Sequence, residues 1–299
     1  MKMLITGGTG FIGRALIAQL APQHDITVLT RNPEQALSRL GSGITPLRSL
    51  ATLANLNEFE AIINLAGEPI ADGRWSTQRK RAICDSRWQL TEALVRLLNA
   101  SDTPPKVWIN ASAIGIYGAR DATPVDESTP LTPMGFAEQV CERWEAIAKR
   151  IADRTRLCIV RIGLVLHPDG GALKKMLPAF RLGLGGPIGS GQQMMSWIHR
   201  DDLVSMMIYL LEQDACQGVF NGTAPNPVSN KAFASSLGQA LGRPAFLPAP
   251  APVLKLALGE MSSLLLTGQA VLPKAAEAAG FEFRYPNLDD ALLAMFNRA

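Results

Sequence analysis

Over the first two-thirds of the chain, short apolar runs alternate with longer segments in which apolar residues recur every three or four positions. The short runs are typical of buried strands, and the longer spacing is typical of amphipathic helices. The predicted strands are Met3–Thr6, Ile26–Thr30, Ala61–Leu65, Val107–Ser112 and Leu157–Leu166. The predicted helices are Phe11–Leu20, Pro33–Leu40, Gln78–Leu98 and Phe136–Ile151. This alternation predicts an α/β fold with a doubly wound, Rossmann-like parallel sheet.

The pattern changes after about residue 167, where Gly/Pro-rich stretches such as "GLGGPIGSGQQ" are broken by a helix near Asp202–Leu211 and a strand-like Gly218–Asn221. Such loops are where an α/β scaffold usually contacts its substrate. From about residue 245 the composition is Ala/Leu/Pro-rich, and a helix is expected near Leu288–Phe296. We predict a Rossmann-like domain over 1–240, with substrate-lobe insertions after about 167, and a smaller C-terminal domain over 245–299.

Composition and charge narrow the function classes. With 47% hydrophobic and 18% charged residues, the chain has the composition of a globular protein. No segment has the roughly 18 uncharged apolar residues of a membrane helix, and the first residues lack a signal-peptide pattern. We therefore expect a cytoplasmic protein. A net charge of +3 argues against nucleic-acid binding, and the basic cluster at 79–81 is typical of a solvated helix face.

The four cysteines predict no metal site and no disulfide framework. They are widely spaced and form no CxxC pair, at positions Cys84, Cys141, Cys158 and Cys216. We expect them to be small buried hydrophobic residues.

The stretch "MLITGGTGFIGRALIAQLA" predicts a dinucleotide site, because glycines at a three-residue spacing lie between the first strand and the first helix. Gly7 permits the sharp turn, Gly10 lets the backbone approach a pyrophosphate, and Gly13 lets helix and strand pack closely. The helix N-terminus then offers amide donors and a favourable dipole to the phosphates. The predicted contacts in this turn are Gly7, Thr9, Gly10, Phe11, Ile12 and Gly13.

The end of the second predicted strand indicates which cofactor is bound. An acidic residue there normally accepts hydrogen bonds from the adenosine ribose of NAD. Here the strand ends "VLTRNP", so Thr30 and Arg31 stand at this position. Because a guanidinium pairs well with a phosphate, we expect NADP(H) as the cofactor and Arg31 as the partner of its 2′-phosphate.

Four motifs in this order, "TGGTGFIG", "NLAGEP", "INASAIGIYG" and "WIHRDDLV", resemble the extended short-chain dehydrogenase/reductases, which include nucleotide-sugar epimerases. The resemblance covers about residues 1–240. Within that superfamily, "GEPIADGRWS", "CERWEAIAKR" and the tail "LPKAAEAAGFEFRYPNLDDAL" look like an atypical branch labelled epimerase-family, or sugar-nucleotide-epimerase-like, protein. The resemblance implies that the C-terminal segment is a small domain specific to this branch.

By the same resemblance, Leu65, Ala66 and Gly67 end a strand beside the adenine and ribose, and Ser112 ends another strand facing the nicotinamide. Ser112 would polarise the substrate oxygen. The superfamily also uses a Tyr as general acid/base, with a Lys four residues later on the same helix face.

That Tyr and Lys pair is missing from this chain. Counting from Ser112 into "MGFAEQVCERWE" places Phe136 at the Tyr position and Val140 at the Lys position. Neither side chain can transfer a proton or carry a charge. Tyr117, five residues after Ser112, remains near the expected nicotinamide site, either as a replacement acid or as a packing or substrate-lining residue.

Three further residues have open roles. Arg87 stands where Asn is common in the superfamily, and it either holds a phosphate or ribose hydroxyl or forms a surface ion pair. Glu68 follows Ala66 and Gly67, and it bonds a ribose, takes part in catalysis or caps a turn. For His199 in "WIHRDDLV", we expect a structural role in a turn before a helix capped by Asp201 or Asp202.

Two classes of function fit these residues. The first is an NADP(H)-binding reductase or epimerase acting on an unidentified small molecule, supported by the cofactor motif and Ser112. The second is a catalytically silent NADP(H)-binding sensor or interaction protein, supported by Phe136 and Val140. The sequence does not decide between them, and it does not identify the substrate or the oligomeric state.

Overall fold

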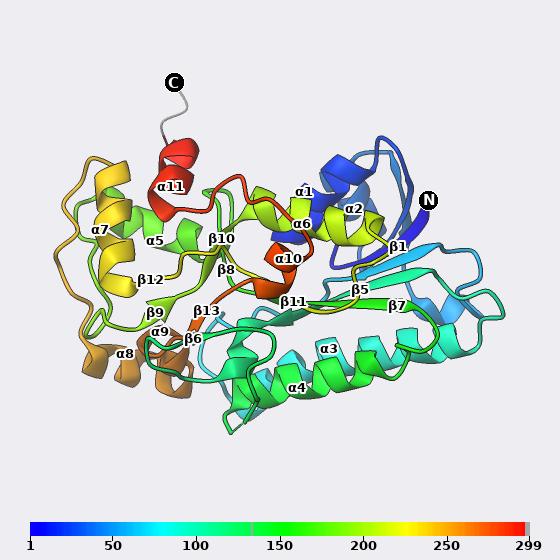
Figure 1. Cartoon of the computed structure of the whole chain (residues 1–299), viewed down its shortest axis with the longest axis horizontal. Helices are drawn as coiled ribbons and strands as arrows, with labels where there is room; N and C mark the ends of the chain where they lie inside the picture. Colours follow the sequence, from blue (N-terminus) through cyan, green and yellow to red (C-terminus); the bar gives the residue numbers. More distant parts are fainter. Residues whose placement is uncertain (133, 297–299) are drawn as a thin grey trace.

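The computed structural model describes residues 1–132 and 134–296. Its centre is a parallel sheet with the strand order β3-β2-β1-β4-β5-β7-β11 (Figure 1). The strands are β1 (Lys2–Thr6), β2 (Asp25–Leu29), β3 (Ile44–Leu47), β4 (Ala61–Asn64), β5 (Val107–Ala113), β7 (Arg156–Ile162) and β11 (Gly218–Gly222). The order reverses direction between β1 and β4, so the predicted doubly wound, Rossmann-like fold is confirmed.

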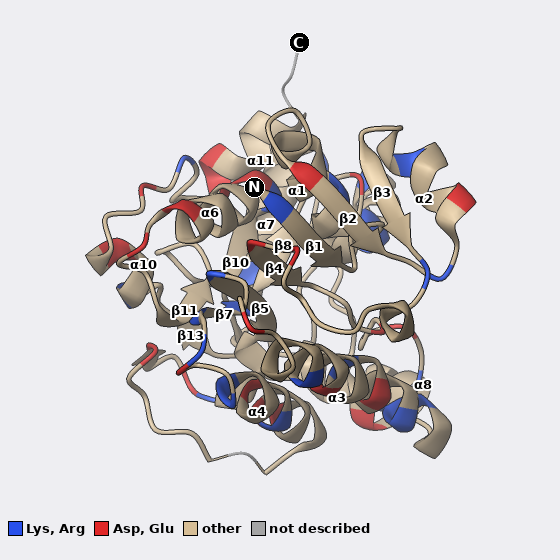
Figure 2. Ribbon diagram, turned by 90° about the vertical axis from the view of Figure 1, so that its right-hand side faces the viewer, with Lys and Arg blue, Asp and Glu red and all other residues tan. Residues whose placement is uncertain are grey.

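Helices cover both faces of the sheet, as the end-on view in Figure 2 shows. They are α1 (Phe11–Leu20), α2 (Pro33–Leu40), α3 (Thr77–Asn99), α4 (Phe136–Lys149) and α6 (Arg200–Glu212). Apolar residues of α1 and α6 pack on one face, and those of α3 and α4 pack on the other. Alternate strand residues point to opposite faces, so Ile5 joins the first core and Leu4 the second.

Two details of the strand prediction are wrong. The apolar run predicted as the strand Leu157–Leu166 is two strands, because the chain leaves the sheet at Gly163 and continues as β8 (Leu164–Leu166). A Cβ at Gly163 would lie 2.5 Å from the carbonyl oxygen of Ser196, so this crossing needs a glycine. The edge strand β3 was not predicted, because its sequence "ITPL" is short and contains Pro46.

After β7 the chain builds a second lobe beside the carboxyl ends of the strands (Figure 1). Its elements are β8, α5 (Gly171–Arg181), β9 (Met194–Met195), β10 (Trp197–His199), β12 (Val228–Ser229) and α7 (Asn230–Ala240). Strand β10 pairs with β8, and β12 pairs with β9. The helices α5 and α7 were not predicted, because the Gly/Pro-rich texture of this region masks their apolar spacing.

The C-terminal segment contacts both the Rossmann-like part and the second lobe. Its elements are α8 (Ala251–Leu258), η3 (Gly259–Ser262), α9 (Ser263–Leu266), β13 (Ala270–Val271), α10 (Lys274–Ala278) and α11 (Leu288–Phe296). Strand β13 pairs with β6 (Pro124–Val125), and the amide of Val271 donates to Ser196 Oγ at 2.7 Å. Phe281 joins the core of α1 and α6, and Leu292 joins the core of the second lobe. The segment thus shares its apolar contacts with both parts of the molecule.

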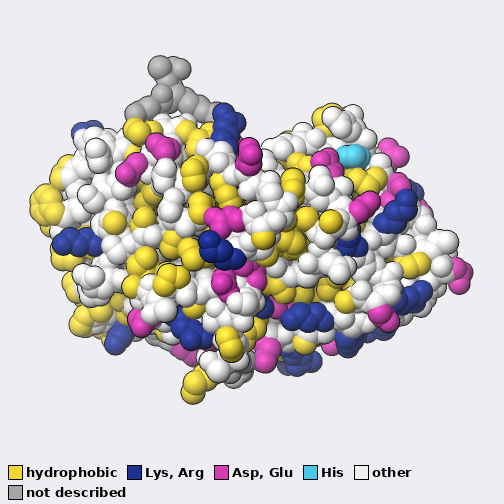
Figure 3. Space-filling view, viewed as in Figure 1, with side chains coloured by type: hydrophobic (Ala, Val, Ile, Leu, Met, Phe, Trp, Pro, Cys, Tyr) yellow, Lys and Arg dark blue, Asp and Glu magenta, His cyan; other side chains and the backbone are white. Residues whose placement is uncertain are grey.

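The surface carries mixed charges. On the face shown in Figure 3, Lys and Arg side chains are interspersed with Asp and Glu. Among the helices of the described residues, none is both long and apolar enough to cross a membrane.

Candidate cofactor site

A cleft of about 1390 Å³ lies at the carboxyl ends of β1, β2 and β4, where the strand order reverses. Open α/β sheets bind their ligands at this place. Three loops line it: Gly7 to Gly10 after β1, Thr30 to Asn32 after β2, and Leu65 to Pro69 after β4. The predicted cofactor-contacting segments therefore meet in one cleft.

The turn after β1 requires its glycines. Gly7 has a φ of +70°, and a Cβ there would lie 2.7 Å from the carbonyl carbon of Leu65. A Cβ at Gly13 would lie 2.4 Å from the carbonyl oxygen of Gly7. The first turn of α1 has no side-chain cap, since Gly10 is its N-cap residue. Its amides are therefore open to a phosphate, and the turn fits a dinucleotide cofactor.

The other residues predicted in this turn lie either at the cleft or against the core. Thr9 lines the cleft beside Gly10. Phe11 and Ile12 begin α1 and pack against the core. The ring of Phe11 also lies against α5, because a Cβ at Gly170 would be 2.3 Å from it. Phe11 thus connects the glycine turn to the second lobe.

The β4 loop is bonded to the glycine turn and supported from beneath. The amide of Ala66 donates to Thr6 Oγ1 at 3.2 Å. Arg87 donates from Nη1 to the carbonyl oxygen of Glu68 at 3.0 Å, and its guanidinium lies over the ring of Trp144. A Cβ at Gly67 would be 2.8 Å from Arg87 Cζ, so a larger residue there would require the guanidinium to shift. Burial lowers the pKa of Arg87. Arg87 supports the backbone of the cofactor loop, a role between the two alternatives expected from the sequence.

Glu68 lines the cleft but already has a partner. Its Oε1 lies 2.7 Å from Arg79 Nη1, and its amide donates to Ser86 Oγ at 2.9 Å. Arg79 also donates to the carbonyl oxygen of Pro69. These contacts favour a structural role for Glu68 within the loop.

Ser112 and Tyr117 belong to a buried polar network. Ser112 Oγ donates to Glu145 Oε1 at 2.8 Å, and Glu145 pairs with Arg161 through both of its carboxylate oxygens. The Tyr117 hydroxyl accepts from Arg161 Nη1 at 2.9 Å and donates to Asn221 Oδ1 at 2.9 Å. Ser112 and Tyr117 are each only 3% exposed. Neither hydroxyl is directed to open space in this arrangement.

Burial and neighbouring groups shift the pKa values of Tyr117 and Arg161 in this network. Burial raises the pKa of the Tyr117 hydroxyl, although Arg161 acts in the opposite direction. Burial disfavours the charged form of Arg161, but the hydrogen bonds and charge of Glu145 outweigh it and raise the Arg161 pKa. A neutral phenol therefore faces a permanent guanidinium. This favours the packing role of Tyr117 that the sequence left open.

The position of the superfamily's Tyr and Lys is apolar. The ring of Phe136 lies 4.9 Å from that of Trp75 in an edge-to-face contact, and Lys80 Nζ lies 4.9 Å from the Phe136 centroid. Val140 is 1% exposed. The structure thus places an aromatic pair and a buried aliphatic side chain where proton transfer would be expected.

His199 caps α6 directly, which corrects the expectation that Asp201 or Asp202 does so. Its Nδ1 accepts from the amide of Asp201 at 3.1 Å. The carboxylate of Asp202 instead accepts from the amide of Tyr285 at 2.9 Å and so holds the C-terminal segment. The structural role expected for His199 agrees with these contacts.

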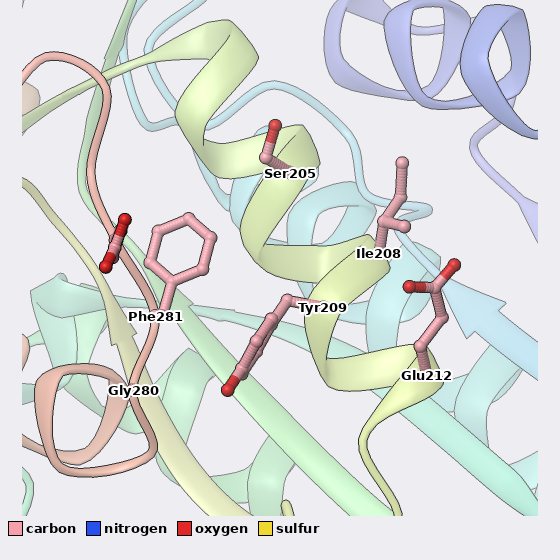
Figure 4. Close-up of a pocket in the computed structure, with 7 residues that line it drawn as sticks. Ser205, Ile208, Tyr209, Glu212, Gly280 and Phe281 are labelled. Carbon is pink, nitrogen blue, oxygen red and sulfur yellow. The ribbon is translucent and has the colours of Figure 1, made fainter.

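The cysteines are free, and among the described residues no group of His, Cys, Asp and Glu is arranged to hold a metal ion. A second hollow of about 400 Å³ lies on the outer side of α6 (Figure 4). Figure 4 shows Ser205, Ile208, Tyr209 and Glu212 along the helix, with Phe281 on the facing segment. The Tyr209 hydroxyl donates to the carbonyl oxygen of Ala279, so it stabilises the turn at this place.

Sequence reasoning missed several lining residues of the cleft. Arg39 lies in the last turn of α2, and Arg48 follows β3, the strand that was not predicted. The sequence signal was available in "LRSL", a basic residue directly after an apolar run. That this residue, Arg48, lies at the cleft follows only from the pairing of the run, as strand β3, with β2.

Models of two protein families together match most of the chain. Residues 3–221 match the model of the NAD dependent epimerase/dehydratase family. Residues 249–295 match a domain of unknown function, DUF1731. The second match falls within the segment for which a separate small C-terminal domain was predicted.

Similar proteins cover nearly the whole chain. The human epimerase family protein SDR39U1 is 38% identical over 98% of this chain and 98% of its own length. The Arabidopsis thaliana protein named "Epimerase family protein SDR39U1 homolog, chloroplastic" is 41% identical over 99% of this chain and 86% of its own length.

Solved structures share the fold. A crystal structure of human SDR39U1 (isoform2) with NADPH has a TM-score of 0.91 and 37% identity, with all of both chains covered. The UDP-glucuronic acid 4-epimerase of Bacillus cereus in complex with UDP-glucuronic acid and NAD has a TM-score of 0.77 at 19% identity, over 99% of this chain and 98% of that one. This second likeness concerns the fold alone.

Proposed function

Because this chain belongs to the NAD dependent epimerase/dehydratase family, we propose that it binds NADP(H) and acts as a reductase or an epimerase on a small molecule. One observation carries the proposal. The glycine turn, with its open amides, and the exposed Arg31 at the end of β2 line the same cleft. The chemistry that such a cofactor supplies when bound is hydride transfer.

Different residues of the cleft contact different parts of the cofactor in this proposal. The amides at the start of α1 bind the pyrophosphate, and Gly7, Gly10 and Gly13 let the backbone come close to it. Leu65, Ala66 and Gly67 form the wall beside adenine and ribose, and Arg87 holds this wall in place from beneath. Thr30 and Arg31 close the adenosine end.

Arg31 selects NADP(H) over NAD(H) in this proposal. No carboxylate stands at the end of β2, where Thr30 and Arg31 follow the strand, so this position lacks the usual acceptor for the ribose hydroxyls of NAD. A guanidinium supplies the charge that a 2′-phosphate requires. The NADPH in the crystal structure of the human relative supports the same choice.

A catalytically silent NADP(H)-binding protein is the second candidate. It is favoured by Phe136 and Val140 at the proton-transfer position and by the commitment of the Ser112 and Tyr117 hydroxyls to the buried network. In that case the protein works as a sensor or an interaction partner. The small-molecule substrate and the cytoplasmic location expected from the sequence remain predictions.

Two measurements test the proposal. Calorimetric titration of the full chain with NADPH and NADH should show tighter binding of NADPH, and equal affinities would contradict it. Absorbance at the NADPH band, with aldehydes, ketones and nucleotide sugars as probes, then separates the two candidates. Turnover supports the enzyme, whereas tight binding without turnover supports the silent protein.

A further inference from the structure

The cofactor cleft has more positive charge than its surroundings neutralise. Four arginines line it: Arg31, Arg39, Arg48 and Arg96. Across residues 1–132 and 134–296, no carboxylate lies within ion-pairing distance of these guanidinium groups, and none of them forms a hydrogen bond. Glu68, the one carboxylate among the described lining residues, is already paired with Arg79. The surplus charge points to an anionic ligand.

The parallel pairing of β2 with β3 brings Arg31 and Arg48 to the same edge of the sheet. Strands β2 and β3 are parallel neighbours with Leu29 beside Leu47, and the amide of Thr30 donates to the carbonyl oxygen of Leu47 at 2.9 Å. Adjacent strands lie about 4.8 Å apart. Arg31 and Arg48 follow the paired leucines by two residues and one residue, so both lie just beyond the carboxyl edge of the sheet, and both line the cleft.

Arg39 adds to this group from a helix. Gln35 and Arg39 are four residues apart in α2, so they lie on one face of the helix, and both line the cleft. The cationic group therefore comes from three separate elements: the β2 loop, α2 and the end of β3.

The glycine turn does not use this charge. Its amides lie after β1 and serve the pyrophosphate without a basic side chain. Arg31, Arg39 and Arg48 come from elements around the end of β2, the adenosine end of the proposed site, where NADP(H) differs from NAD(H) only by a phosphomonoester. A phosphomonoester carries up to two negative charges near neutral pH, so it can pair with more than one guanidinium.

We propose that Arg48 is a second ligand of the adenosine 2′-phosphate, shared with Arg31, and that Arg39 raises the local positive potential. The inference rests on the proposed binding of NADP(H), and it extends the selectivity to a residue after β3 that the cofactor motif does not contain. Arg48 is a specificity-determining residue in this assignment.

Titrations with two fragments test this role on the full chain. The first fragment, 2′,5′-ADP, carries a 5′-monophosphate and the 2′-phosphate, and the second, 5′-AMP, lacks only the 2′-phosphate. The variants are Arg31→Gln, Arg48→Gln and the control Arg150→Gln. Arg150 is exposed at the end of α4 and has no side-chain partner among the described residues, so its substitution removes the same charge outside the cleft.

We expect Arg48→Gln to weaken the binding of 2′,5′-ADP about tenfold or more, because a charge-assisted hydrogen bond is lost. The affinity for 5′-AMP should change by less than about twofold. The salt dependence of 2′,5′-ADP binding should also become shallower, since one cation no longer contacts the phosphate. Arg150→Gln should match the wild type with both fragments.

Two outcomes overturn the assignment. In the first, Arg48→Gln keeps the wild-type preference for 2′,5′-ADP. In the second, it weakens both fragments equally, which indicates a structural effect. A wild-type protein that binds both fragments equally would instead contradict the proposed NADP(H) selectivity itself, so the two failures are distinguishable.

Discussion

At the scale of single residues, two pairs of polar side chains differ in whether their polar atoms already have partners within the described structure. Arg31 and Arg48 have no carboxylate partner in the described structure and line a cleft, so they remain available to a ligand. Ser112 and Tyr117 have all their polar atoms bonded in the interior. The first pair is suited to binding, and the second pair is suited to stability.

The change Arg31→Asp should reverse the cofactor preference. It replaces the cation for the 2′-phosphate with an acceptor for the ribose hydroxyls, and a charge-assisted bond of this kind contributes about 1.5–3 kcal/mol. We expect NADPH to bind roughly ten- to a hundred-fold more weakly and NADH more tightly. Titration of wild type and variant with both cofactors measures the effect. An unchanged preference would contradict the role of Arg31.

The change Tyr117→Phe should affect stability rather than binding. It leaves Asn221 Oδ1 and Arg161 Nη1 without a partner in a buried site, at a cost of about 1–3 kcal/mol. We expect a lower denaturation midpoint in urea and an NADPH affinity within about a few-fold of wild type. An unchanged midpoint together with loss of turnover on any substrate would instead assign Tyr117 a catalytic role.

At the scale of elements, α4 has packing side chains at the two positions where the family resemblance predicts the Tyr and Lys. Phe136 contacts Trp75, which lies just before α3, and Val140 is buried against α3, where its carbonyl oxygen accepts from Trp88 Nε1 at 3.1 Å. The same helix contributes Glu145 to the network at the end of β5. Substitutions in α4 therefore act on its packing as well as on any chemistry.

The double change Phe136→Tyr with Val140→Lys should not create a fast enzyme. A lysine at position 140 places an ammonium in a site that is 1% exposed, and its burial disfavours the charged form. We expect a clear loss of thermal stability with little gain in activity. The single change Phe136→Tyr serves as the control, because it leaves Val140 in place. A stable double variant with fast NADPH turnover would show that the site is only two side chains away from catalysis.

At the scale of the whole molecule, the C-terminal segment connects the two lobes. Tyr285 packs against the ring of His199, with their centroids 4.3 Å apart, and its amide donates to Asp202. His199 ends β10 and caps α6, so one buried imidazole lies where three parts of the fold meet. The protonation of this imidazole should affect the stability of the whole protein.

Stability should fall as the pH decreases from about 6.5 to about 4. Burial lowers the pKa of His199 to about 4, although Asp201 acts in the opposite direction. The unfolded chain therefore binds a proton in this range and the folded chain does not, so the free energy of unfolding rises with pH between these values. The full effect is up to about 3 kcal/mol.

Denaturation in urea at pH 7 and pH 4.5 measures this effect. His199→Asn is the matched control, because asparagine also caps a helix but does not titrate. We expect the variant to lose less stability than the wild type over this range. Equal losses in both proteins would assign the pH dependence to other groups.

The features that the sequence determined by itself are local ones. The glycine turn, Arg31 after β2 and the replacement of the Tyr and Lys pair each depend on a few consecutive residues, and their patterns are complete within one strand, turn or helix. For the same reason, the helices of the Rossmann-like part were predicted close to their observed bounds, whereas the change of direction at Gly163 inside an apolar run was not.

Only the tertiary structure decided which distant residues meet. Ser112 Oγ bonds to Glu145, 33 residues later, and the Tyr117 hydroxyl bonds to Asn221, 104 residues later, so only the fold shows that these two candidate catalytic hydroxyls lie in a buried network. The position of Arg48 at the cleft follows from the pairing of β3 with β2. Contacts between distant residues form through packing and strand register, to which every element contributes, and no short stretch of sequence contains that information.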